Sequence, residues 1–103
     1  MSDLGGIAHM VLLQWRADTP AAELDSLRRH VARFTSDIPG VLDAVVGPSV
    51  SPEGLEAGFT WGLAVTFTDA AARDGYLDHP THVAAATVIG AWAERIAVVD
   101  VAR

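Results

Sequence analysis

The sequence contains no cysteine and no lysine, and its cations are seven arginines. Without cysteine there are no disulfides, thiolate nucleophiles or thiolate metal sites. Thirteen acidic residues give a formal net charge of −6, so neither nucleic acid nor an anionic membrane surface is expected as a partner. No apolar run reaches the ~18 residues of a membrane span. The first six residues lack the basic start of a signal peptide, so we expect a cytoplasmic protein.

Apolar residues are abundant for a chain of this size. They make up 50% of the 103 residues, whereas charged residues make up 19%. This composition excludes a disordered chain, which would be poor in apolar residues and rich in charge. The length predicts one domain over residues 1–103, with more apolar surface than a domain this small hides easily.

The first half of the chain predicts a strand followed by a helix. Residues 7–15 form a nearly continuous apolar run, typical of a buried strand. Thr19 is predicted to cap a helix whose first residue is Pro20. Apolar residues then recur at spacings of three and four through residue 38, which predicts one helix over residues 20–38.

The rest of the chain predicts two strands, two helices and a last strand. Residues 41–46 and 59–67 are the strands, and the second alternates strictly between large apolar and small residues. One helix begins at a cap, Thr68 or Asp69, and runs to about residue 78, and the next covers residues 80–94. Residues 96–101 form the last strand.

With the last two helices counted as one helix broken at His79-Pro80, the order is βαββαβ. It predicts an α+β fold of the ferredoxin-like type, a four-stranded antiparallel sheet with helices on one face. The uncovered face should be polar in a monomer, yet the first and last strands are apolar at both alternating sets of positions. A second copy of the sheet is the simplest cover, so we expect a homodimer that forms a dimeric α/β barrel. Leu12 and Val99 are candidates for the covered face.

The segment from Tyr76 to His82 is the first candidate site. A tyrosine hydroxyl can donate to a developing oxyanion, and a histidine can accept a proton. His82 falls in the first turn of a helix, where the free N–H groups keep an imidazole neutral. Alternatively, His79 only forms the turn before Pro80 and His82 caps the helix. No metal is expected, because two histidines without a carboxylate cluster seldom bind one tightly.

His9 and Asp100 are polar residues inside otherwise apolar strands. A buried imidazole or carboxylate needs a partner, and a histidine is a plausible partner for Asp100. The alternatives are a satisfied core histidine and an ordinary aspartate at a strand end.

At these residues the sequence resembles the stress-responsive dimeric α/β-barrel (Dabb) family. The resemblance covers nearly the whole chain and is carried by five segments: His9-Met-Val-Leu-Leu13, Ile38-Pro39-Gly40, the loop over residues 51–58, Tyr76-x-x-His79-Pro80-x-His82 and Val98-Val99-Asp100. It implies the ferredoxin-like dimeric barrel. Its olivetolic acid cyclase branch catalyses a cofactor-free intramolecular aldol condensation of a poly-β-keto thioester. By resemblance, His82 is the base, Tyr76 the oxyanion donor and His9 a pocket residue.

We therefore expect a cofactor-independent aldol cyclase or lyase acting on a small hydrophobic or carbonyl-rich substrate. His82 would remove a proton next to a carbonyl, Tyr76 would stabilise the oxygen, and His9 would orient substrate or hold a water. Asp100 and His79 would support these groups. The expected pocket walls are aromatic: Trp15, Phe34, Trp61 and Phe67. The helix after His82 is rich in alanine, so the resemblance does not transfer a substrate. Two alternatives are a non-catalytic stress-responsive barrel protein that binds a hydrophobic ligand or assembles, and a barrel-type monooxygenase.

Overall fold

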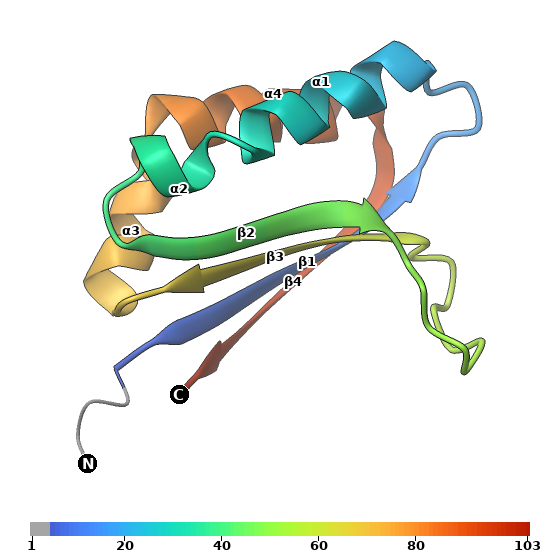
Figure 1. Cartoon of the computed structure of the whole chain (residues 1–103). Helices are drawn as coiled ribbons and strands as arrows, with labels where there is room; N and C mark the ends of the chain where they lie inside the picture. Colours follow the sequence, from blue (N-terminus) through green and yellow to red (C-terminus); the bar gives the residue numbers. More distant parts are fainter. Residues whose placement is uncertain (1–4) are drawn as a thin grey trace.

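The computed structural model describes residues 5–103. The prediction about a signal peptide concerns the first six residues, of which residues 1–4 lie outside the described part. The strands and helices follow in the order β1 Ile7–Trp15, α1 Ala21–Val31, α2 Phe34–Asp37, β2 Val41–Pro48, β3 Trp61–Phe67, α3 Ala70–Asp78, α4 Pro80–Trp92 and β4 Ala93–Ala102 (Figure 1). No helix within residues 5–103 is long and apolar enough to cross a membrane.

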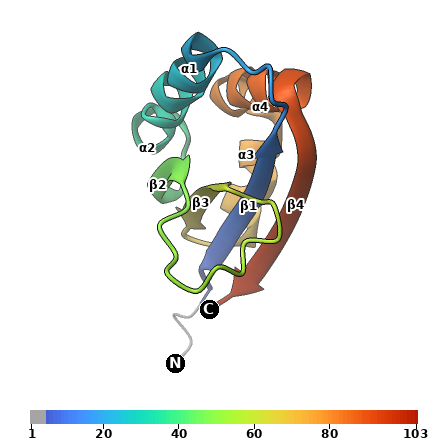
Figure 2. The ribbon, with the colours of Figure 1, turned by 90° about the vertical axis from the view of Figure 1, so that its right-hand side faces the viewer.

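The strands form one four-stranded sheet in the order β2-β3-β1-β4, and every neighbouring pair is antiparallel. The helices lie together on one face of this sheet, and the opposite face has no layer over it (Figure 2). The ferredoxin-like plan predicted from the order of elements is therefore confirmed. Strand β4 is longer than predicted and lies at the edge beside β1.

The prediction of one helix over residues 20–38 is wrong. The chain leaves helix α1 after Val31 and makes a tighter turn, in which the Arg33 N–H donates to the His30 carbonyl at 3.1 Å. Helix α2 then starts at Phe34, whose ring is fully buried and lies 5.5 Å from the Tyr76 ring. The buried apolar residues before and after this turn all face the core, so their spacing in the sequence is the same as in one continuous helix.

Two predicted caps had different outcomes. Asp69 caps α3, because its carboxylate accepts the Ala72 N–H at 2.8 Å. Thr19 does not cap α1; its hydroxyl donates to the Arg16 carbonyl at 2.7 Å and so stabilises the turn after β1. Pro20 is the N-cap residue of α1 and makes no side-chain cap bond.

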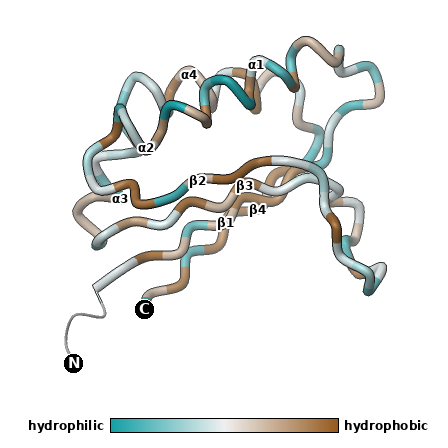
Figure 3. The backbone as a smooth tube through the Cα atoms, viewed as in Figure 1, coloured by the Kyte–Doolittle hydropathy of each residue, from teal (hydrophilic) through white to brown (hydrophobic). Residues whose placement is uncertain are grey.

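The two faces of the sheet are both apolar. On the face toward the helices, Val11, Leu13 and Val65 are buried core residues. We call the opposite side the open face; its side chains are 37–60% exposed at Met10, Leu12, Val45, Val99 and Val101. Hydrophobic colouring continues along the strands in Figure 3. The loop after β2 projects away from the helices (Figure 1) and borders a concavity of ≈ 760 Å³ with Met10 and Leu12.

Candidate functional site

A second cavity, of ≈ 270 Å³, lies on the helix side of the sheet. Its polar side chains come from three elements: His9 from β1, Tyr76 from α3 and His82 from α4. The remaining walls are apolar: Val11, Leu63, Leu77, Ala85, Ala86, Ile89, Gly90, Ile96 and Val98. We call this the helix-side cavity. The structure thus brings together three residues that are far apart in the sequence.

The turn between α3 and α4 places His82 against Tyr76. Pro80 forces His79 into extended geometry, with φ −71° and ψ 136°, and the His79 Nδ1 accepts the Thr81 N–H at 3.1 Å. His79, not His82, therefore caps α4, and it does not line the cavity. Within residues 5–103 no three side chains of the metal-binding types gather into a cluster.

His82 is held in the form that a general base requires. Its Nδ1 lies 3.1 Å from the Leu77 carbonyl oxygen, which can only accept, so Nδ1 carries the hydrogen and Nε2 keeps its lone pair. Burial lowers the pKa of His82, and the neighbouring His9 lowers it further, outweighing the Leu77 carbonyl. The imidazole is thus neutral near pH 7, with Nε2 available to take a proton.

Tyr76 contributes a hydroxyl without a partner. The side chain is 1% exposed, and its oxygen has no hydrogen-bond partner among residues 5–103. Its ring lies 4.1 Å from the His82 ring and 5.5 Å from the His9 ring, measured between centroids. Burial, together with the charge of Asp100, raises the pKa of Tyr76 far above its usual value, so the hydroxyl remains a donor. An unsatisfied donor at a cavity wall favours an oxygen atom of a ligand as its partner.

His9 belongs to a short chain of polar contacts. Its Nδ1 lies 2.6 Å from Asp100 Oδ1, directly across the β1–β4 pair, and Arg73 donates to the other carboxylate oxygen at 2.5 Å. Burial raises the pKa of Asp100, but the hydrogen bonds from His9 and Arg73 lower it more, so the carboxylate stays charged. A carboxylate accepts, so the His9 Nδ1 carries the hydrogen of this bond.

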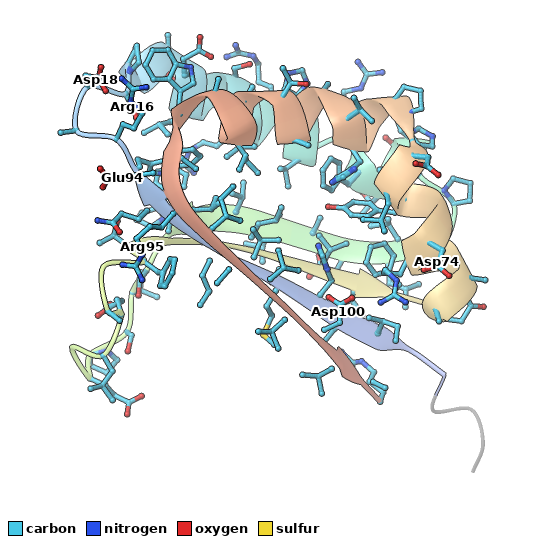
Figure 4. All side chains as sticks on the ribbon, turned by 180° about the vertical axis from the view of Figure 1, so that it is seen from behind. Arg16, Asp18, Asp74, Glu94, Arg95 and Asp100 are labelled. Atoms are coloured by element: carbon cyan, nitrogen blue, oxygen red, sulfur yellow. The ribbon has the colours of Figure 1, made fainter. Side chains whose placement is uncertain are left out.

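Figure 4 shows Asp100 on β4, on the same side of the molecule as Asp74 of α3. Arg73, next to Asp74, was not among the residues predicted from the sequence. The available signal was its position three residues before Tyr76, one helical turn away.

The four aromatic residues predicted as pocket walls do not line the helix-side cavity. Phe34 and Phe67 are fully buried behind Tyr76, with centroid distances of 5.5 and 4.9 Å. The ring centroids of Trp15 and Trp61 lie 5.9 Å apart, and Trp61 borders the ≈ 760 Å³ concavity beside the loop after β2 instead. Sequence spacing identified these rings as apolar but not which space they border.

Comparison with known proteins identifies a family and relatives of this fold. Residues 7–102 match the family described as the stress responsive A/B barrel domain. The chain is 23% identical over 94 residues to olivetolic acid cyclase of Cannabis sativa, covering 91% of this chain and 93% of the cyclase.

Solved structures share the fold over nearly the whole length. A dimeric ferredoxin-like protein of unknown function from Jannaschia sp. CCS1 is 28% identical, with a TM-score of 0.81 over 96% of this chain and all of the other (100%). Hydroxynitrile lyase from Passiflora edulis is 18% identical, with a TM-score of 0.84 over 97% of this chain and 94% of the lyase, a likeness of fold alone.

Proposed function

We propose that this chain, which belongs to the stress-responsive A/B barrel domain family, is a cofactor-independent enzyme that removes a proton next to a carbonyl group. The observation that carries the proposal is the unpartnered Tyr76 hydroxyl beside the neutral His82. A donor for an oxyanion and a base for a C–H proton are the two groups that enolate formation needs.

In the proposed reaction, His82 Nε2 takes a proton from the carbon α to a carbonyl. The Tyr76 hydroxyl donates to the carbonyl oxygen, where negative charge develops. The enolate carbon then attacks a second carbonyl carbon and forms a C–C bond, and the new alkoxide takes the proton back from His82. In reverse, the same groups cleave the C–C bond of a β-hydroxy carbonyl compound, which makes the chain an aldol cyclase or lyase.

His9 has a supporting part in this proposal. The charged Asp100, held by Arg73, keeps hydrogen on the His9 Nδ1, so that Nε2 accepts a hydrogen bond from a substrate hydroxyl or a water. The distant similarity to olivetolic acid cyclase supports this assignment.

We also propose that the working form is a homodimer that pairs two open faces into a barrel. The exposed apolar residues on this face are more than scattered surface hydrophobics, since Met10, Leu12 and Val99 lie on adjacent paired strands. Structural relatives from Bacteroides fragilis and Jannaschia are dimeric proteins with this fold.

The first experiment measures deuterium uptake at the methyl carbon of acetophenone in D₂O, by mass spectrometry. This readout follows proton removal without requiring the natural substrate. His82→Gln should slow uptake about 10²–10⁴-fold, and Tyr76→Phe about 10- to 10³-fold. His30→Gln is the matched control, because His30 lies on α1 and does not line the cavity.

Unchanged uptake in His82→Gln would contradict the base assignment. No uptake above the buffer rate with the unaltered protein would favour the second candidate, a barrel protein that binds a hydrophobic ligand without reaction. The apolar walls of the helix-side cavity are the observation in favour of that candidate.

A further inference from the structure

The helix-side cavity has a polar end and an apolar end. His82 and Gly90 are eight residues apart on α4, about 12 Å along the helix axis. On the facing strand, Asp100 and Ile96 are four residues apart, about 13 Å. Asp100 contacts His9, and the Tyr76 ring lies 5.5 Å from the His9 ring and 4.1 Å from the His82 ring, so both elements place their polar residues at the same end. A ligand with its oxygen at Tyr76 therefore extends its body toward Gly90 and Ile96.

Small residues of α4 create the space at the apolar end. Ala85, Ala86 and Gly90 line this wall, and a Cβ added at Gly90 would meet no atom within 4 Å. A cavity of about 150 Å³ lined by apolar side chains holds one benzene molecule. The ≈ 270 Å³ of this cavity thus hold one ring and a short substituent.

The charges around the cavity disfavour anionic ligands. The cavity walls include no arginine, and their titratable side chains are His9, Tyr76 and His82. The carboxylate of Asp100 contacts His9 directly, while Arg73 is already engaged by Asp100 and Asp74. A carboxylate on the ligand would lose its hydration without gaining a cation.

Building on the proposed function, we propose that the substrate is an uncharged carbonyl compound about the size of a short phenyl ketone. Its oxygen accepts from Tyr76, and its apolar body packs against Ala86 and Gly90, which set the upper limit of its size. The Tyr76 hydroxyl has no partner among residues 5–103 and belongs to a residue that is 1% exposed, so it marks the polar end independently of the small residues.

The test uses nuclear magnetic resonance of protein labelled with ¹³C in the tyrosine rings. Tyr76 is the only tyrosine, so every labelled ring signal reports on this site. Acetophenone, hexanophenone and benzoate are titrated separately. We expect acetophenone to shift the Tyr76 signals, and the longer ketone and the anion to bind at least about tenfold more weakly, as for extra groups in a fitted apolar pocket.

Leucine substitutions on α4 then test the size limit. Ala86→Leu and Gly90→Leu should each weaken acetophenone binding about tenfold or more. Ala91→Leu is the matched control, because Ala91 is an exposed residue of the same helix outside the cavity wall. Circular dichroism confirms that each variant is folded. If Ala86→Leu does not fold, Gly90→Leu alone tests the size limit, because a Cβ at Gly90 meets no atom within 4 Å.

The outcomes separate this inference from the proposed function. Equal binding of hexanophenone, or acetophenone binding unaffected by a folded leucine variant, would overturn the size limit even if His82-dependent deuterium uptake is intact. Tight benzoate binding at Tyr76 would overturn the preference for an uncharged ligand. Selective acetophenone binding without His82-dependent uptake would support the ligand assignment and contradict the proposed chemistry.

Discussion

Replacing Tyr76 with phenylalanine should stabilise the protein while it slows the reaction. The substitution removes a hydroxyl that has no partner among residues 5–103 and keeps a ring that is 1% exposed. The contacts of that ring with Phe67 at 4.9 Å and Phe34 at 5.5 Å do not involve the hydroxyl and remain.

The size of the effect follows from the cost of an unsatisfied buried polar group, about 1–3 kcal/mol. We expect a gain of about 1 kcal/mol in the free energy of unfolding, at the lower end of this range. For a domain of about 100 residues that gain corresponds to a Tm higher by roughly 4–8 °C.

The assay is urea unfolding followed by tryptophan fluorescence, with every protein at the same protomer concentration because association adds to apparent stability. Tyr76→Leu is the control, since it removes the hydroxyl and the ring together and should destabilise the fold. A loss of 1 kcal/mol or more in Tyr76→Phe would show that the hydroxyl is hydrogen-bonded in the free protein. That result would remove the main support for an oxyanion donor at this position.

Three further predictions address the base, the association surface and a turn. Because burial lowers the pKa of His82, deuterium uptake should decline on acidification with a midpoint below pH 6.5, the ordinary histidine value; a midpoint above pH 6.5 would contradict the neutral base. Leu12→Glu should convert dimers to monomers in light scattering, whereas Val83→Glu, on exposed α4 surface, should not; a dimeric Leu12→Glu would rule out the open face as the interface. Gly40→Ala should cost about 2–4 kcal/mol of unfolding free energy in urea titration, because φ is +83° and the new Cβ would lie 2.3 Å from the Ala72 Cβ; a cost under 1 kcal/mol would contradict the turn geometry.

Most of the fold was predictable because the spacing of apolar residues and the residues that begin and end helices indicate the same elements along the chain. The alternation over residues 61–67, the cap at Asp69 and the proline at the start of α4 specify local structure through interactions within a few residues. The interruption of the first helix after Val31 was not predictable in this way. It depends on the burial of Phe34 against Tyr76, a contact between residues that are 42 positions apart.

The candidate site was also predictable only in part. His9, Tyr76 and His82 are identifiable from the sequence because a polar residue in an apolar strand or a turn needs a hydrogen-bond partner or a function, and the structure places them around one cavity. The walls were not identifiable from the sequence. Whether Phe67 or Ala86 faces the cavity depends on how far α4 stands from the sheet, and spacing within one element carries no information about that distance.

The pairing of β4 with β1 has a consequence for how the chain tolerates insertions and deletions. Successive residues of β4 point to opposite faces, so Asp100 meets His9 while Val99, one residue earlier, lies on the open face. Sliding β4 by a single residue would exchange the two sets, placing a carboxylate on the apolar face and a valine opposite His9. The junction of α4 and β4 at Ala93 is therefore a place where losing or gaining one residue would abolish the polar site and the apolar surface together, although neither set of side chains had been mutated.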